Sequence, residues 1–321
     1  MEQAILDFNK QFGFIPEIQN RDNFKPSKNI ILAGMGGSHL AGGIIKDVLP
    51  FSNLYIHWDY GIPAIPKESL ENSLLVASSY SGNTEEVLEF AEKAIENKYN
   101  LICIAVGGKL LDLAKENNIP YIKVPDTGIQ PRSALGFSMI AIAHACGFDS
   151  LLPELAFLKD KINPLDFKGQ GEEMSEVLFG CIPVIYSSRD YGSVAYNWKI
   201  KMNETGKIPA FYNLFPELNH NEMQGMDRID SNKSLTEKFH FVFLEGPDIH
   251  PRIKKRMEVA EKLYQDRGMP VTHRFLDGES KLERIFRSLL IADWTALNLS
   301  KKYGTEAEKV PMIEEFKGLI Q

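Results

Sequence analysis

The chain has 321 residues, 44% of them hydrophobic, a composition typical of a globular protein large enough for two domains. Its formal net charge is −7 and it has no lysine- and arginine-rich run, which argues against nucleic acid or an anionic membrane surface as a partner. The first residues lack a secretory signal pattern and no later stretch is long enough to span a membrane, so we expect a cytoplasmic protein.

The first half of the chain alternates strands and helices. After an N-terminal helix, strands are predicted at 29–33, 73–79, 101–106 and 120–124, and helices at 38–49, 84–97 and 133–145. Such alternation is typical of a parallel sheet with helices on both faces.

Residues 151–180 interrupt the alternation, so we place a domain boundary there, with an N-terminal domain of residues 1–152 and a C-terminal domain of residues 153–321. The pattern then restarts, with strands at 182–188, 208–213, 239–244 and 270–275 and helices up to about residue 204, at 252–267 and at 282–302. Two stretches, SSYSGNTEE and SSRDYGSVA, share one pattern. Each comes at the end of a predicted strand and contains two serines and a glycine turn that leads into a helix. This weak similarity suggests a duplicated α/β unit.

The turn SSYSGNTEE, residues 78–86, leads directly into a helix N-terminus, where free backbone N–H groups and the helix dipole favour a negative charge. We interpret it as a phosphate cradle in which Ser79, Ser81 and Thr84 supply hydroxyls. Gly82 would let the backbone approach the ligand closely. Helix capping is the alternative, but it accounts for only one or two of these residues.

A second glycine turn, GMGGS, spans residues 34–38 between the first strand and its helix. His39 stands where the dinucleotide fingerprint G-x-G-x-x-G needs glycine, and the G-K-[ST] of a nucleotide-binding P-loop is also missing. We therefore interpret Gly36, Gly37 and Ser38 as the other half of the phosphate cradle.

The stretch of residues 201–225 contains two candidate proton-transfer groups. Glu204 is predicted near a helix C-terminus, where the dipole and partial burial would raise the pKa of its carboxyl group. His220, within PELNHNE, has a side chain that titrates near neutral pH. From spacing alone, a solvated glutamate and a surface or capping histidine are the favoured interpretations.

Arg132, within PRSALG, lies in a loop between a strand and an apolar helix. A guanidinium facing an anion there would stabilise developing negative charge, and a surface arginine is the alternative.

The cysteines and histidines predict neither a disulfide framework nor a metal site. Cys103, Cys146 and Cys181 lie in apolar contexts without paired spacing, and we expect them to be buried. His144 is expected in the core, and no partners at metal-ligand spacing accompany His57, His240, His250 and His273. We expect no metal and no other cofactor.

With GMGGS, SSYSGNTEE, PRSALG and the pair NETGK and ELNHNE in order, the chain resembles the sugar isomerase (SIS) superfamily, and specifically the bifunctional phosphoglucose/phosphomannose isomerases. The glycine and serine turns mark the superfamily, which also includes binding modules, whereas PRSALG with the last pair is more specific. The resemblance implies an α/β fold of two SIS-type subdomains, each a parallel sheet flanked by helices. It also implies a homodimer with the active site near the subunit boundary.

The resemblance further implies an aldose–ketose isomerase that interconverts glucose 6-phosphate and mannose 6-phosphate with fructose 6-phosphate, without metal or redox cofactor. It makes Ser38, Ser79, Ser81 and Thr84 the phosphate site. Glu204 would move a proton between carbons 2 and 1 of the open-chain sugar, His220 would assist ring opening, and Arg132 would stabilise the enediolate. Lys317, within PMIEEFKGLI, matches a lysine that the family places near ring opening, and an exposed amphipathic-helix lysine is its plain alternative.

Two alternatives remain open. One is an SIS isomerase of another sugar phosphate, such as an arabinose, heptose or amino-sugar phosphate. The other is a sugar-phosphate sensor that uses the cradle without the catalytic base.

Overall fold

The computed structural model describes residues 1–320, which form two compact units. The N-terminal unit runs from Leu6 to Asn163, and the C-terminal unit contains Met1–Ile5 together with the chain from Pro164 onward. This division falls later than the expected one at residues 152 and 153, because α7 (Leu151–Lys161) packs on α6 and on the 3-10 helix η1 (Phe8–Gly13) of the N-terminal unit. Within α1 (Glu2–Leu6), Glu2 pairs with Lys168 and Lys301 of the C-terminal unit.

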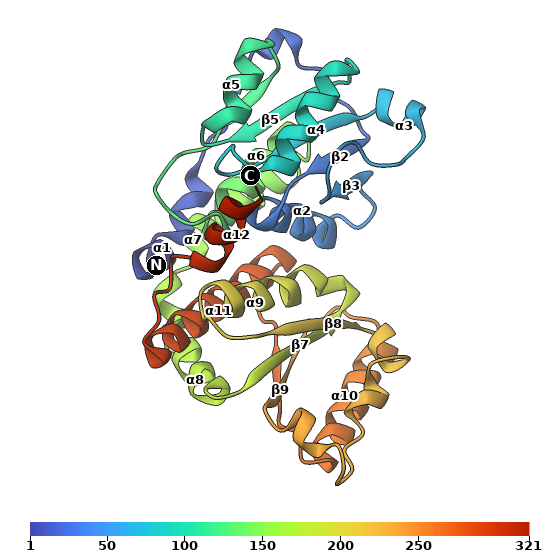
Figure 1. Cartoon of the computed structure of the whole chain (residues 1–321), viewed down its shortest axis with the longest axis vertical. Helices are drawn as coiled ribbons and strands as arrows, with labels where there is room; N and C mark the ends of the chain where they lie inside the picture. The colour runs from blue at the N-terminus through green and yellow to red at the C-terminus, as the bar shows by residue number, and fades with distance from the viewer. Residues whose placement is uncertain (321) are drawn as a thin grey trace. The chain divides into compact units, whose positions relative to one another are not determined.

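The N-terminal unit is built on a six-stranded sheet (Figure 1). In spatial order its strands are β1 (Ile18–Gln19), β6 (Tyr121–Lys123), β5 (Leu101–Ala105), β4 (Leu74–Ser78), β2 (Ile30–Ala33) and β3 (Leu54–His57). β1 pairs antiparallel with β6, and all other pairs are parallel. The central strands β2, β4 and β5 are buried along their whole length, as expected for parallel strands covered on both faces. These three and β6 confirm the predicted strands, whereas β1 and β3 were not predicted.

Helices cover both faces of this sheet. α4 (Glu85–Glu96) and α5 (Gly108–Glu116) pack with Ile31, Leu75 and Cys103 in one apolar cluster. α2 (Gly36–Val48) contacts the other face, where Gly42 lies against Leu32, and α6 (Leu135–Ala145) packs on α2. α6 is buried almost all round, in agreement with its apolar sequence. The short α3 (Lys67–Glu71) precedes β4.

The C-terminal unit has a four-stranded, fully parallel sheet. Its spatial order is β10 (Val271–Phe275), β9 (Phe239–Glu245), β7 (Ile182–Ser188) and β8 (Phe211–Phe215). Its helices are α8 (Lys168–Leu178), α9 (Gly192–Glu204), α10 (Pro251–Asp266), α11 (Lys281–Tyr303) and α12 (Pro311–Leu319). α9 packs on β7 and β8, α10 lies across the sheet from α9, and α11 packs on α8 and α9 (Figure 1).

Both sheets share one strand order. β3-β2-β4-β5 in the N-terminal unit corresponds to β8-β7-β9-β10 in the C-terminal unit. In the N-terminal unit, β3 lies on one side of β2 and β4 lies on the other. In the C-terminal unit, β8 and β9 flank β7 in the same way, so a topological switch point lies between β2 and β4 and between β7 and β9. The shared order agrees with two units of one type, but it pairs the SSRDYGS turn after β7 with the glycine turn after β2 and not with the serine turn after β4. Ligands of open α/β sheets bind at the carboxyl ends of the strands at such a point.

No helix among residues 1–320 combines the length and the apolar character that crossing a membrane requires.

Candidate functional site

The predicted cradle lies at the switch point of the N-terminal sheet. Its serine-rich turn follows β4 and its glycine turn follows β2, and these strands are neighbours. The Ser79 hydroxyl lies 2.8 Å from the Thr84 hydroxyl and accepts a hydrogen bond from the N–H of Gly82 at 3.1 Å. Ser79 is buried and Thr84 half-buried, whereas Ser81 is exposed and its hydroxyl accepts from the N–H of Asn83 at 3.2 Å.

Capping does not explain Thr84. It stands at the N-cap of α4, yet its side chain makes no capping hydrogen bond and its hydroxyl pairs with Ser79 instead. The first turn of α4 therefore keeps backbone N–H groups that its own N-cap side chain does not satisfy, as an anion site at a helix N-terminus requires.

Gly82 is required by the geometry of the turn. Its φ is +73°, and a Cβ atom there would lie 1.8 Å from the carbonyl oxygen of Gly107. The turn after β4 and the loop after β5 therefore touch backbone to backbone, which no other residue type permits at this position.

Ser38 joins the two halves of the cradle. Its side chain is buried, and its hydroxyl accepts a hydrogen bond from the N–H of Tyr80 at 2.9 Å. The turn after β2 is thus bonded directly to the turn after β4, as the sequence interpretation of GMGGS required.

Arg132 lies beside the glycine turn. It belongs to the 3-10 helix η3 (Pro131–Ser133), and a Cβ atom on Gly37 would stand 2.5 Å from the carbonyl of Pro131. Gln11 holds the segment from behind, donating to the carbonyl of Ser133 at 2.7 Å. Arg132 is only 3% exposed, so it is not the surface arginine of the alternative. The structure brings Arg132 and the cradle turn of Gly36, Gly37 and Ser38 together.

The other predicted site residues belong to the C-terminal unit. Glu204 is the last residue of α9 and is half-buried, which confirms the predicted helix end. The ammonium of Lys207 donates hydrogen bonds to the backbone carbonyls of Glu204 and Lys309, and so ties the segment before α12 to the end of α9.

His220 is exposed and follows the 3-10 helix η6 (Glu217–Asn219). It lines a hollow of about 270 Å³ whose other wall includes Leu263 and Tyr264 of α10. Its turn connects the end of β8 to further 3-10 turns.

Lys317 stands on α12, where no residue is buried. Met312, Phe316 and Leu319 of this helix are also exposed, so its apolar side faces outward within the C-terminal unit. The exposure agrees with the amphipathic-helix interpretation of Lys317.

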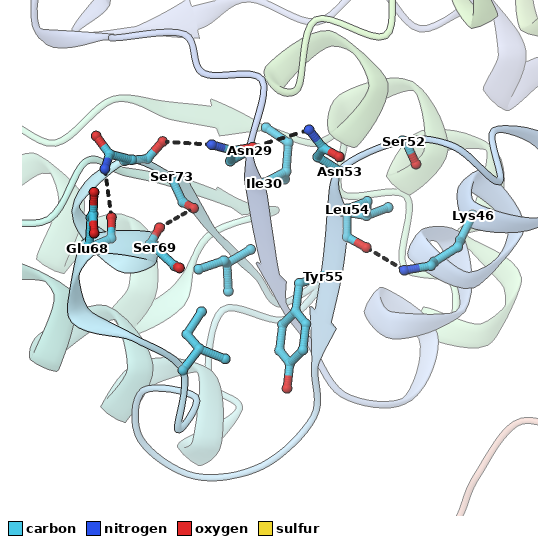
Figure 2. Close-up of a pocket in the computed structure, with 13 residues that line it drawn as sticks. Asn29, Ile30, Lys46, Ser52, Asn53, Leu54, Tyr55, Glu68, Ser69 and Ser73 are labelled. Atoms are coloured by element: carbon cyan, nitrogen blue, oxygen red, sulfur yellow. Dashed lines mark hydrogen bonds between the residues drawn. The ribbon is translucent and has the colours of Figure 1, made fainter.

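A different hollow, of about 530 Å³, lies at the amino ends of β2 and β3 (Figure 2). Its polar groups bond to one another: Asn53 donates to Asn29 at 3.2 Å, and Ser73 to the carbonyl of Ser69 at 2.6 Å. It lies at the edge of the sheet opposite to the switch-point crevice, and we do not assign the function to it.

The cysteines differ in exposure. Cys103 and Cys146 are buried as expected, and burial raises the pKa of the Cys103 thiol to about 12. Cys181 is only partly buried, contrary to expectation, because it lies in the turn before β7. His144 is also only partly buried. Residues 1–320 contain no group of three or more histidine, cysteine, aspartate or glutamate side chains placed to hold a metal ion.

Two residues of the quoted motifs have structural roles that the sequence did not predict. Lys207, in NETGK, and Glu222, in ELNHNE, each join segments distant in the sequence. The only sequence signal for them was their position in the motifs that also contain Glu204 and His220, the two candidate proton-transfer residues.

Comparisons with known proteins agree with this architecture. A family of bacterial phospho-glucose isomerase C-terminal SIS domains matches residues 167–320. The chain is 33% identical over 312 residues to a bifunctional phosphoglucose/phosphomannose isomerase of Aquifex aeolicus, with 95% of each chain covered. It is 34% identical over 298 residues to the protein of the same name from Thermoplasma acidophilum, covering 91% of this chain and 89% of that one.

Among solved structures, tagatose-6-phosphate ketose/aldose isomerase from Escherichia coli superimposes with a TM-score of 0.67 at 17% identity, covering 95% of this chain and 93% of its own. At this identity the likeness shows the fold alone.

Proposed function

The chain belongs to the family of bifunctional phosphoglucose/phosphomannose isomerases, and we propose that it interconverts glucose 6-phosphate and mannose 6-phosphate with fructose 6-phosphate. The observation that carries this proposal is the cradle at the switch point, where the buried hydroxyls of Ser38 and Ser79 meet the N-terminus of α4. Hydroxyls and N–H groups that converge at a helix N-terminus suit a phosphate dianion.

We assign the proton transfer to Glu204. In the open-chain aldose, its carboxylate takes the acidic proton from carbon 2, and the electron pair of that C–H bond forms the double bond of a cis-enediolate. A second proton passes from the hydroxyl on carbon 2 to the oxygen on carbon 1, and the carboxyl group of Glu204 returns its proton to carbon 1, which gives the ketose. Carbon 2 is planar in the intermediate, so a site that presents either face to Glu204 serves both glucose and mannose phosphates.

Ring opening precedes this step. We assign it to His220, because an imidazole can both donate and accept a proton, with Lys317 as an assisting cation. Arg132 is assigned to the negative charge of the enediolate, which its guanidinium stabilises more strongly when buried.

The proposal is tested by a coupled assay of the purified protein with chelator present. Fructose 6-phosphate is supplied, and glucose 6-phosphate and mannose 6-phosphate are followed separately. We expect both products, and we expect E204Q to lower kcat by about 100- to 10,000-fold while fructose 6-phosphate still binds. E217Q, which alters an exposed glutamate of η6, is the control and should stay within about twofold of wild type.

The same assay separates the alternatives. If neither product forms while fructose 6-phosphate binds, the sensor interpretation replaces the enzyme. If glucosamine 6-phosphate, arabinose 5-phosphate or a heptose phosphate is turned over faster than fructose 6-phosphate, the substrate assignment is wrong and the isomerase class stands.

We also propose that the protein acts as a homodimer in the cytoplasm. The support is the family resemblance, together with the exposed apolar residues of α12. Sedimentation velocity that shows one species of single-chain mass at micromolar concentration would refute the dimer, and cell fractionation tests the compartment.

A further inference from the structure

The carboxylate of Glu222 is bonded to the sheet of the C-terminal unit. Its Oε1 atom accepts a hydrogen bond from the hydroxyl of Tyr186, and its Oε2 atom accepts one from the side-chain amide of Asn213 at 2.5 Å. Tyr186 belongs to β7 and Asn213 to β8. One loop side chain is therefore bonded to two adjacent strands, which fixes the loop relative to the sheet.

Tyr186 is a rigid anchor for this contact. Its side chain is fully buried, and its ring centroid lies 5.4 Å from that of Phe241, 5.5 Å from that of Phe243 and 5.9 Å from that of Phe215. Burial is the main cause that raises the pKa of the Tyr186 hydroxyl far above its ordinary value. The hydroxyl therefore stays protonated and acts as a donor to the carboxylate.

The turn that Glu222 holds also carries His220. The N–H of His220 donates to the carbonyl of Glu217 at 2.9 Å, so the imidazole moves with this turn. Because a hollow of about 270 Å³ lies beside the turn, packing does not fix it on that side. The hydrogen bonds of Glu222 do so instead, together with one from Arg256 to the side-chain oxygen of Asn219 at 3.3 Å.

We propose that Glu222 is a positioning residue for ring opening, holding the turn where the His220 imidazole can pass a proton to and from the sugar ring oxygen. This inference rests on the proposed function. Opening the pyranose breaks the bond between carbon 1 and the ring oxygen; the oxygen gains a proton, and the hydroxyl on carbon 1 loses one to become the aldehyde. Reclosure on either face interconverts the α and β anomers. Anomerisation therefore reports ring opening without proton transfer at carbon 2.

The test measures exchange between the anomers of glucose 6-phosphate by NMR, with the full-length protein. E222L leaves two donors without their acceptor and releases the turn, so we expect anomerisation to slow by about 100-fold, the scale of an ångström-sized misplacement. E222Q still offers an oxygen acceptor and should retain most of the rate. A five-carbon aldonate phosphate, an open-chain probe that needs no ring opening, should bind E222L as it binds wild type.

Glu217 is the matched control, because it stands on the same turn with an exposed side chain whose carboxylate accepts a hydrogen bond from the nearby side-chain amide of Asn221 at 2.8 Å. E217L should anomerise at the wild-type rate. H220N, which lacks the imidazole, gives the lowest anomerisation rate expected among the variants. E204Q should anomerise while failing to isomerise. Y186F removes a single donor without changing the packing and should slow anomerisation less than E222L, which keeps the proposal testable if E222L folds poorly.

Wild-type anomerisation in folded E222L, or in Y186F if E222L does not fold, overturns the proposal. So does a loss of aldonate affinity as large as the loss of anomerisation, because that outcome means general damage. If the wild-type protein neither anomerises nor isomerises, the proposed function fails and this inference fails with it.

Discussion

The two units of this protein have the same strand order, but different side chains lie at their switch points. In the N-terminal unit, the crevice between β2 and β4 is lined by small hydroxyl side chains and glycine, among them Ser38, Ser79 and Gly82. In the C-terminal unit, the crevice between β7 and β9 is occupied by the protein's own side chains. The turn SSRDYGS places Tyr191 there, fully buried.

Tyr191 is bonded into a cluster that closes the second crevice. Its hydroxyl donates to Asp248 at 2.7 Å and accepts from the Nε of Arg284 at 3.0 Å. Its ring lies so close to Gly246 that a Cβ atom there would be 2.0 Å from a ring carbon. The switch point of the N-terminal unit is therefore the proposed phosphate site, whereas the corresponding place in the C-terminal unit holds a buried side chain that contributes to stability.

The largest effect is expected from Gly82→Ala. A Cβ atom would stand 1.8 Å from a backbone oxygen, at a φ of +73°, so we expect a loss of about 3 kcal/mol or more in the free energy of unfolding. Gly192 is the glycine of the serine turn after β7, with a φ of −61° and a flexible Leu214 as its nearest neighbour. Gly192→Ala should change stability by less than about 1 kcal/mol. Urea unfolding measures the free energy of unfolding of both variants. Equal losses in the two variants would contradict the comparison.

Tyr191→Phe should destabilise the protein by about 1–3 kcal/mol, because it removes two hydrogen bonds from a buried cluster. It should leave KM for fructose 6-phosphate unchanged, since the second crevice binds no substrate in our proposal. Thermal unfolding and steady-state kinetics measure the two quantities. A marked rise in KM would show that the C-terminal crevice takes part in substrate binding.

Ser79 and Ser188 are the second serines of two similar Ser-Ser pairs, one directly after β4 and one at the end of β7, although these two strands do not correspond in the shared strand order. The Ser79 hydroxyl bonds to Gly82 and Thr84, whereas the Ser188 hydroxyl is buried without a hydrogen-bond partner among the described residues. Ser79→Ala should cost about 1–2 kcal/mol of stability and raise KM about tenfold. Ser188→Ala should be neutral or slightly stabilising, because it removes an unsatisfied polar group. If urea unfolding shows a larger loss of stability for Ser188→Ala than for Ser79→Ala, this prediction is wrong.

The smallest effect concerns alkaline pH. Burial first, and then the hydrogen bond to Asp248, raises the pKa of the Tyr191 hydroxyl. As pH rises, Tyr191 loses its hydroxyl proton in the unfolded chain, at a pH of about 10, before it does so in the folded chain. Its contribution to stability is therefore complete below that pH and falls above it. The difference in free energy of unfolding between wild type and Tyr191→Phe should therefore shrink as pH rises above about 10. A constant difference across this range would contradict the assignment.

Much of the fold followed from local pattern. Short apolar runs such as Ile182–Ser188 were readable as buried parallel strands because both of their faces are apolar. β3 was missed because its apolar run, Leu54 to Ile56, is only three residues long and stands between the polar residues Asn53 and His57. The domain boundary was placed too early because packing of α7 on η1, a contact distant in sequence, assigns it to the N-terminal unit.

The sequence by itself determined the α/β class, the two serine turns and the chemistry available in them, because glycine, hydroxyls and strand-to-helix periodicity are local properties. Only the tertiary structure decided which turn is filled by a bonded tyrosine side chain. The two turns differ by the side chain of Tyr191, whose partners Asp248 and Arg284 lie 57 and 93 residues further along the chain. Tertiary packing likewise decided that Tyr186 and Asn213 hold Glu222, since hydrogen bonds between strands and loops depend on a strand order that no local pattern encodes.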